Sequence, residues 1–245
     1  MPSRPQTAVA LGMDGALWAR EGLVQLLTVT PFWASIETDM PMELWRRLAG
    51  DRVILAAGLE LLVRPYHDYR PLQFNSLETV RGAAASLLSR GADRVYLFNY
   101  MDSQTAMTDL ENYPALLREC GRLETLVGKR RRHVITYSDT WAPGEAAGSQ
   151  LPKKVEAGQW VSFRLHVGPR LRNASIRLEL EDCQVAELRW NGELCQPGGA
   201  AEAGKPGPAR GFQVWRGPEG VEGWGVVDVK AGTAGRVHWV EVAGG

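Results

Sequence analysis

Glu60 is the residue of this sequence best placed to do chemistry. It lies within residues 56–62, where all of its neighbours are aliphatic or glycine. An unpaired carboxylate is costly to bury, so a carboxylate in such a segment is usually paired or functional. There it can act as a nucleophile or exchange protons with a substrate. We predict that Glu60 is catalytic; the alternatives are an ion pair with Arg64 or an outward-facing side chain.

Polar and aromatic residues that suit a carbohydrate follow a second apolar segment. Asn99, Tyr100 and Asp102 come directly after the sequence RVYLF of residues 94–98. Asn and Asp side chains exchange hydrogen bonds with sugar hydroxyls, and a tyrosine ring packs against the apolar face of a sugar. We predict that all three residues bind substrate. For Asn99, capping the end of the preceding segment is an equal alternative.

Aromatic and acidic side chains also lie together at residues 32–39. Phe32 and Trp33 are followed by Glu37 and Asp39. Aromatic rings cover the C–H faces of sugars while carboxylates bind their hydroxyls. We therefore predict that Trp33 and Asp39 contact the substrate. The alternative is a solvated acidic turn whose aromatic residues pack within the loop.

Several other kinds of chemistry lack support in the sequence. The four histidines, at positions 67, 133, 166 and 238, are too far apart to suggest a metal site. No Gly-x-Ser-x-Gly motif or glycine-rich phosphate loop is present. His67, beside Asp68 and Tyr69, is more typical of an exposed loop than of a catalyst. We expect no metal and no cofactor.

Charge and hydropathy bear on the partners and the compartment. The chain has 28 basic and 28 acidic residues, so no net field favours nucleic acid. No run reaches the roughly 18 apolar residues that a membrane span needs. No secretory signal follows Met1, which leaves the localisation open. Three cysteines are too few for a disulfide framework: Cys183 and Cys195 form a pair on neighbouring strands or, as we favour, are free thiols.

A repeated pattern of helix, glycine and strand positions these residues. Glycines at 22, 50 and 91 each end an amphipathic segment and precede an apolar one. We expect helices over residues 14–21, 41–50, 76–90 and 113–127, and strands over residues 23–29, 52–57 and 94–99. Apolar strands separated by helices predict a parallel sheet. Long polar loops after the strands favour a β/α barrel, with a doubly wound sheet as the alternative.

The sequence pattern changes near residue 129. Residues 129–133, KRRRH, form a basic run that we interpret as a solvated hinge or an edge near the domain junction rather than a nucleic-acid patch. Short alternating segments follow, at residues 160–167, 175–180, 186–190, 212–216, 225–229 and 236–242. With turn signals such as Asn191-Gly192, they predict an antiparallel β-sandwich, and residues 196–211 suggest a mobile loop. We expect a partial (β/α)8 barrel of about three units at residues 1–130 and a β-sandwich at residues 131–245.

Three blocks in the first half resemble bacterial glycoside-hydrolase-like (β/α)8 proteins. They are LGMD with WAREGLV within residues 11–24, GLE at residues 58–60, and RGAA with GADRVYLFN within residues 81–99. In that family the blocks belong to the last three of eight barrel strands, and a β-rich domain can follow. The resemblance implies hydrolysis of O-glycosyl bonds, with Glu60 on strand seven as the nucleophile. It also implies a general acid/base glutamate on strand four.

This placement puts strands one to five outside the chain. We therefore expect an incomplete or truncated catalytic barrel that binds carbohydrate and associates with a second copy or a complementing polypeptide through its open sheet. Whether the chain is an enzyme by itself stays open, because the acid/base strand is missing. Two noncatalytic alternatives are a carbohydrate-binding protein that uses the tryptophans of its β domain and a structural or interaction protein.

Overall fold

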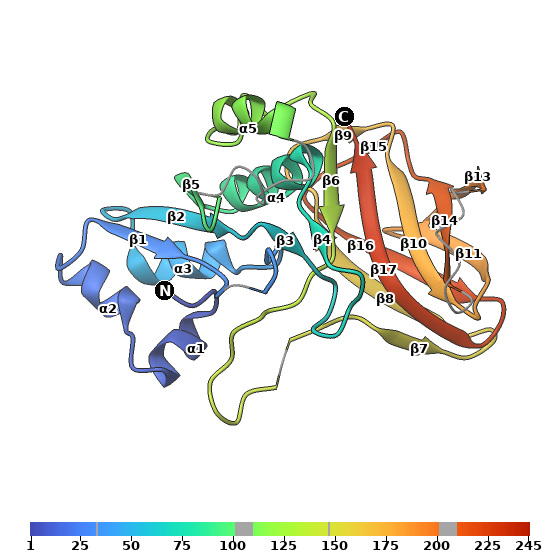
Figure 1. The fold of residues 1–245 in the computed structure, drawn as a ribbon, viewed down its shortest axis with the longest axis horizontal. Coiled ribbons are helices and arrows are strands. Elements are labelled where there is room, and N and C mark those ends of the chain that lie inside the picture. The colour runs from blue at the N-terminus through green and yellow to red at the C-terminus, as the bar shows by residue number, and fades with distance from the viewer. Residues whose placement is uncertain (33, 101–109, 147, 201–209) are drawn as a thin grey trace.

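The computed structural model describes residues 1–32, 34–100, 110–146, 148–200 and 210–245. These residues form a mixed helix and sheet structure that is rich in strands. A parallel sheet with strand order β1-β2-β5 lies in the N-terminal half, and antiparallel sheets of six and four strands make up the C-terminal half (Figure 1).

The N-terminal half contains the three predicted helix–strand units. Its strands are β1 (Leu26–Val29), β2 (Ile54–Leu59) and β5 (Arg94–Leu97), which pair in parallel. The helices before them are α2 (Gly15–Arg20), α3 (Met42–Ala49) and α4 (Leu77–Ser89). The remaining elements are α1 (Pro5–Ala10), the hairpin of β3 (Leu62–Val63) and β4 (Gln73–Phe74), the 3-10 turn η1 (Leu110–Asn112) and α5 (Tyr113–Glu119). The predicted units and parallel pairing are confirmed.

Local sequence sets where these helices begin and end. A capping box starts α4: Ser76 Oγ accepts from the Thr79 amide, and Thr79 Oγ1 accepts from the Ser76 amide. The box satisfies amides that the first helical turn leaves unpaired. Gly50 and Gly91 follow α3 and α4 with φ angles of +78° and +112°, which side chains rarely adopt. These glycines turn the chain from each helix toward the next strand.

The helix α5 is shorter than predicted. Leucines at helical spacing suggested a helix over residues 113–127, but residues 120–128 contain turns and no helix. The Thr125 hydroxyl donates to the carbonyl of Glu119, an acceptor that the Leu123 amide takes in a continuing helix. Gly121 weakens helix formation at the same place. A local side-chain hydrogen bond thus overrides the apolar periodicity.

Antiparallel strands build the C-terminal half, as predicted. The six-stranded sheet contains β6 (Arg131–Val134), β7 (Lys153–Val155), β10 (Ser175–Glu181), β13 (Gln196–Ala200), β14 (Arg210–Arg216) and β17 (Gly235–Gly244). The four-stranded sheet contains β8 (Trp160–His166), β11 (Val185–Trp190), β12 (Glu193–Leu194) and β16 (Trp224–Ala231), and β9 (Leu171–Arg172) pairs with β15 (Gly220–Val221). Asn191 and Gly192 join β11 to β12 with φ angles of +49° and +84°, which confirms the predicted tight turn.

The basic run at residues 129–133 is only partly as predicted. It lies at a sheet edge, because β6 ends the strand order of the six-stranded sheet. It is not solvated throughout, since Arg131 and His133 are buried. The Arg131 guanidinium donates to the carbonyls of Pro169 and Arg170, and burial lowers its pKa. Backbone oxygens therefore pair with Nη2, while Nε and Nη1 are buried without a hydrogen bond to a described residue. The run of basic residues did not indicate this burial.

The strand β6 also joins the two halves of the molecule. It lies beside α4 (Figure 1), so closely that a Cβ on Gly82 would stand 2.0 Å from the carbonyl oxygen of Arg132. Buried apolar side chains form one continuous cluster that includes residues from both halves. The division into residues 1–130 and 131–245 stays a prediction.

Two remaining expectations for the C-terminal half differ in outcome. Residues 196–200 form the strand β13, which corrects part of the mobile loop predicted at residues 196–211; residues 201–209 lie outside the described residues. Cys183 and Cys195 are buried free thiols, as is Cys120. The favoured alternative of unpaired cysteines is confirmed.

Candidate functional site around Glu60

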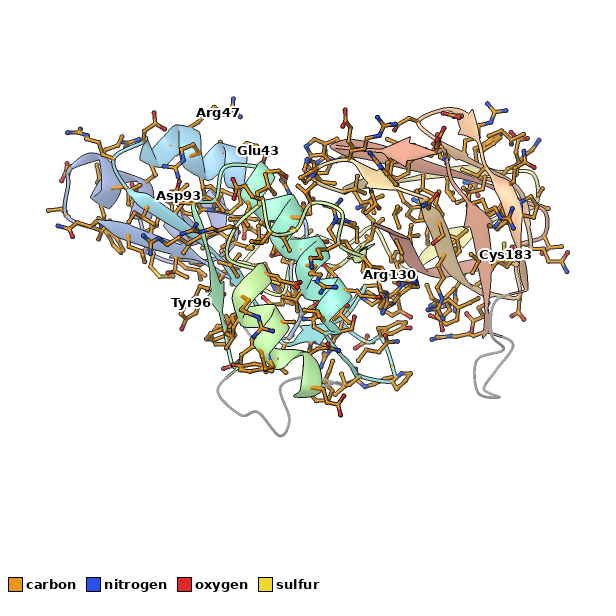
Figure 2. The ribbon with its side chains drawn as sticks, turned by 90° about the horizontal axis from the view of Figure 1, so that it is seen from above. Glu43, Arg47, Asp93, Tyr96, Arg130 and Cys183 are labelled. Atoms are coloured by element: carbon orange, nitrogen blue, oxygen red, sulfur yellow. The ribbon has the colours of Figure 1, made fainter. Side chains whose placement is uncertain are left out.

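Glu60 lies at the carboxyl end of the parallel sheet, directly after the last residue of β2. Alternation along the strand places it on the same face as Ala56 and Gly58. Gly58 pairs with Tyr96 of β5, and the exposed Tyr96 side chain points away from α5 (Figure 2). The sheet face that carries Glu60 is therefore open to solvent at β5.

The carboxylate of Glu60 is buried but has a specific partner. Only 1% of the surface of Glu60 is exposed to solvent. The Asn99 amide donates to it, with Nδ2 at 3.1 Å from Oε2 and 3.4 Å from Oε1. Among the described residues, Arg64 makes no ion pair with Glu60; its guanidinium lies instead 3.5 Å from the carbonyl oxygen of His67. The partner of Glu60 is thus the neutral Asn99 amide and not the Arg64 guanidinium, which was the alternative drawn from the sequence.

This environment raises the pKa of Glu60 to about 7. Burial is the main cause, because it disfavours the charged form, and the Asp139 carboxylate adds repulsion. Hydrogen bonds from the Asn99 side chain and the Leu61 amide act in the opposite direction. Near neutral pH the side chain therefore populates both protonation states, which is the range in which a carboxyl group can exchange protons or, when ionised, attack.

Asn99 and Tyr100 approach Glu60 from the residues just beyond β5. Asn99 has a φ of +64°, a left-handed conformation that Asn tolerates better than most residues. Tyr100 is buried, and its hydroxyl donates to the Glu60 carbonyl. The Asn75 amide donates to the same carbonyl. Tyr100 thus supports the Glu60 backbone, and its ring is buried; its role in binding substrate stays a prediction.

The other predicted site residues do not join this group. Trp33 and Asp102 lie outside the described residues. Asp39 lies among three arginines, with its carboxylate oxygens 3.8–4.0 Å from guanidinium nitrogens of Arg4, Arg90 and Arg164. The structure thus brings Glu60, Asn99 and Tyr100 together and places Asp39 in a separate surrounding.

Asp139 is a residue of the site that sequence reasoning missed. Its carboxylate accepts hydrogen bonds from the amides of Phe32 and Ala34, at 2.8 and 2.7 Å, and so holds the loop after β1. The same loop passes close to β2, because a Cβ on Gly58 would lie 2.2 Å from Thr30 Oγ1. The two Asp139 contacts join residues more than 100 positions apart, so no local pattern could reveal them.

A second unforeseen cluster lies where the N-terminal half meets β10 and β17. The Tyr66 hydroxyl is 2.6 Å from Nδ1 of His238, whose Nε2 is 2.9 Å from Glu181 Oε2. Tyr66 and Tyr69 pack edge to face, and Tyr69 packs against Trp239. The cluster anchors the loop that follows β3 to the C-terminal sheet. It therefore stabilises this loop, which is a neighbour of the Glu60 site.

Neither a metal centre nor a membrane span emerges from the described part of the chain. In the described ranges, no three His, Cys, Asp or Glu side chains gather as ligands for a metal ion. No helix there has the length and apolar character needed to cross a bilayer. His67 is exposed and contacts Asp68, as expected for a loop histidine.

Comparisons with known proteins give only distant structural similarity. No protein-family model and no curated protein matches the chain. The structure of BuGH86 with neoagarooctaose is 17% identical over 46% of this chain and 18% of that chain, with a TM-score of 0.28. BpGH86A, a β-porphyranase of glycoside hydrolase family 86 from the human gut bacterium Bacteroides plebeius, is 10% identical over 95% of this chain and 65% of that chain, with a TM-score of 0.31. The chain spans less than two thirds of either protein, and TM-scores this low establish no shared fold.

Proposed function

We propose that this chain is a carbohydrate-active protein whose reactive group is the Glu60 carboxylate and whose reaction is hydrolysis of a glycosidic bond. The observation that supports this proposal best is the pairing of a buried, high-pKa glutamate with an amide donor at the carboxyl end of a parallel strand. Ligand chemistry in β/α barrels occurs at that end of the strands.

In the proposed reaction, ionised Glu60 attacks the anomeric carbon of the sugar. The bond from that carbon to the leaving oxygen breaks, a second carboxyl group protonates the leaving oxygen, and water later hydrolyses the glycosyl ester. The Asn99 amide orients the attacking oxygens and favours their charged form. Asp139 fixes the loop beside them and is a positioning residue.

We propose that the parallel sheet is three strands of a β/α barrel, with the C-terminal sheets forming a β-sandwich domain. The sheet face that carries Glu60 has small residues in β2, Ala56 and Gly58, and exposed residues in the flanking strands, Leu26 and Tyr96. Further strands would cover such a face and supply the second carboxyl group. A second copy or a complementing polypeptide can provide them, and light scattering of the purified chain tests for association.

Noncatalytic carbohydrate binding by tryptophans on the strands of the C-terminal half has less support. Trp190, Trp215 and Trp239 are buried. Trp160 is exposed, but Arg189 and Lys230 lie over its ring, at 5.1 and 5.8 Å from the centroid. Cation–π contacts thus occupy the ring that a sugar needs for stacking.

Activated substrates test the reaction without the second carboxyl group. A 2,4-dinitrophenyl glycoside needs almost no protonation of its leaving group, so Glu60 alone can release dinitrophenolate from it. We expect release from at least one member of a panel of hexose and pentose glycosides. Glu60→Gln should slow that release by about 100-fold or more. Asp68→Asn, which removes an exposed carboxylate from the next loop, is the matched control and should keep the rate.

Two results would reject the proposal. One is equal release by the wild-type chain and Glu60→Gln. The other is no release above the buffer rate from any glycoside of the panel, measured both with the chain alone and at concentrations at which light scattering finds it associated.

A further inference from the structure

A cavity of about 470 Å³ that is lined by polar and apolar groups lies between α1 and the segment of residues 136–146 and 148–150. Figure 1 shows this segment beside α1 on its way from β6 to β7. The volume falls within the range of about 300–1,000 Å³ that is typical of small-molecule sites. The cavity is distinct from the surroundings of Glu60, which does not line it.

One extended segment separates the cavity from the Glu60 site. Thr136, Ser138 and Thr140 line the cavity. The alternate residues face the other way: Tyr137 packs edge to face on His67, and Asp139 binds the loop after β1. The segment therefore presents one row of side chains to each site.

Hydrogen bonds fix the walls of the cavity. Glu145 Oε2 accepts from the Thr7 hydroxyl at 2.8 Å and from the Ala142 amide at 2.7 Å, which ties the segment to α1. Arg4 Nη2 lies 3.0 Å from the buried carboxylate of Glu37, so its guanidinium is held in place. A ligand would meet these groups already ordered, which lowers the entropic cost of binding.

The cavity presents an aromatic ring beside unused polar groups. The Trp141 side chain lines it and is 42% exposed. Glu145 uses only Oε2 in the hydrogen bonds formed with described residues, which leaves Oε1 as an acceptor. The exposed Gln6 amide makes no side-chain hydrogen bond to a described residue. A ring that covers C–H groups, next to acceptors and an amide for hydroxyls, is the chemistry that recognises a sugar.

The charges in the cavity select a neutral ligand. The lining carboxylates Asp39 and Glu145 and the buried Glu37 are balanced by the guanidiniums of Arg4, Arg90 and Arg164, which lie within about 4 Å of Glu37 or Asp39. The cavity therefore has no net charge that would attract an anion or a cation.

We infer that this cavity is a saccharide-binding site, which takes a neutral mono- or disaccharide unit stacked on Trp141. It is separate from Glu60 and does not depend on the reaction proposed there. Sugar hydroxyls donate to Asp39 and to Oε1 of Glu145, and the Gln6 amide bonds with a further hydroxyl.

Saccharide titrations of the full chain test this site. The probes are glucose, galactose, cellobiose, lactose and maltose, with binding followed by isothermal calorimetry and by saturation-transfer NMR of the sugar C–H protons. We expect at least one of them to bind, and Trp141→Ala to weaken that binding about tenfold or more. Trp160→Ala, at an equally exposed tryptophan that lies on β8, is the matched control and should bind as the wild type does. Gln6→Ala changes an exposed residue and should weaken binding without loss of folding.

The outcomes distinguish this site from the proposed reaction. Glu60→Gln should keep the saccharide affinity even if it removes every hydrolytic activity. The inference is overturned if none of the five probes binds below 20 mM, if folded Trp141→Ala and Gln6→Ala both bind like the wild type, or if Trp160→Ala loses binding instead. Tighter binding of tetramethylammonium or inorganic phosphate at Trp141 would also overturn it, because the cavity would then be an ion site.

Discussion

The raised pKa of Glu60 makes the stability of this chain depend on pH in a way that one substitution removes. The carboxyl group has a pKa of about 7 in the folded chain, against 4.5 as its ordinary value. Between these two values the folded chain retains a proton that the unfolded chain releases. The contribution of Glu60 to stability is therefore greatest below pH 4.5 and falls as the pH rises toward 7.

The size of this effect follows from the two pKa values. A difference of one pKa unit corresponds to about 1.36 kcal/mol, so the full loss above pH 7 is at most about 3 kcal/mol. Between pH 5 and pH 8 the expected loss is about 2.5 kcal/mol. In Glu60→Gln the side chain does not titrate, and Oε1 of the glutamine can still accept from Asn99. The free energy of unfolding of this variant, relative to the wild type, should therefore rise by about 2.5 kcal/mol from pH 5 to pH 8.

Urea denaturation at pH 5, 6, 7 and 8 and constant ionic strength measures this difference. Glu124→Gln, at an exposed glutamate in the turns that follow α5, controls for the general effect of removing one negative charge. Any change in stability caused by the substitution that does not depend on pH appears as a constant offset, so only the slope with pH reports on the titration. A difference between Glu60→Gln and the wild type that stays constant with pH, or falls as the pH rises, would refute the account of the Glu60 environment.

Three further substitutions test the geometry around the site. Asn99→Ala removes the donor that lowers the pKa of Glu60, so ¹³C NMR should show the side-chain carboxyl titrating at higher pH than in the wild type; an unchanged or lower midpoint contradicts the contact. Gly82→Ala places a Cβ against the Arg132 carbonyl and should lower stability by about 2 kcal/mol or more in thermal unfolding, whereas a neutral effect would disprove the close packing of α4 on β6. Ser76→Ala breaks the capping box and should cost about 1 kcal/mol in urea unfolding, and no loss would mean that the box is not formed in solution.

Local sequence signals predicted the elements that depend on local chemistry. Glycines at 50 and 91 end helices through positive φ angles, and Ser76 starts one through its hydroxyl, so both boundaries followed from single residues. The position of Glu60 after an apolar strand was also a local signal. Its contact with Asn99 was not predicted, although both residues were selected separately.

Contacts between distant segments explain what the sequence did not reveal. Asp139 binds amides of residues 32 and 34, and Tyr66 bonds with His238, so each group depends on the folded topology. The basic run misled for a related reason: Arg131 is buried, and its Nη2 donates to the carbonyls of residues 169 and 170, which are distant in the sequence. The cavity beside Trp141 likewise forms only when α1 meets residues 136–146 and 148–150.

Covalent trapping tests the central claim most directly. A 2-deoxy-2-fluoro glycosyl 2,4-dinitrophenyl compound, of the sugar that the wild-type chain accepts best, slows hydrolysis of the glycosyl ester and so accumulates it. After digestion, peptide mass spectrometry should find the fluoroglycosyl group on Glu60, and no adduct should form in Glu60→Gln. An adduct on another carboxylate, or equal labelling of the Glu60→Gln variant, would contradict the assignment of Glu60 as the reactive group.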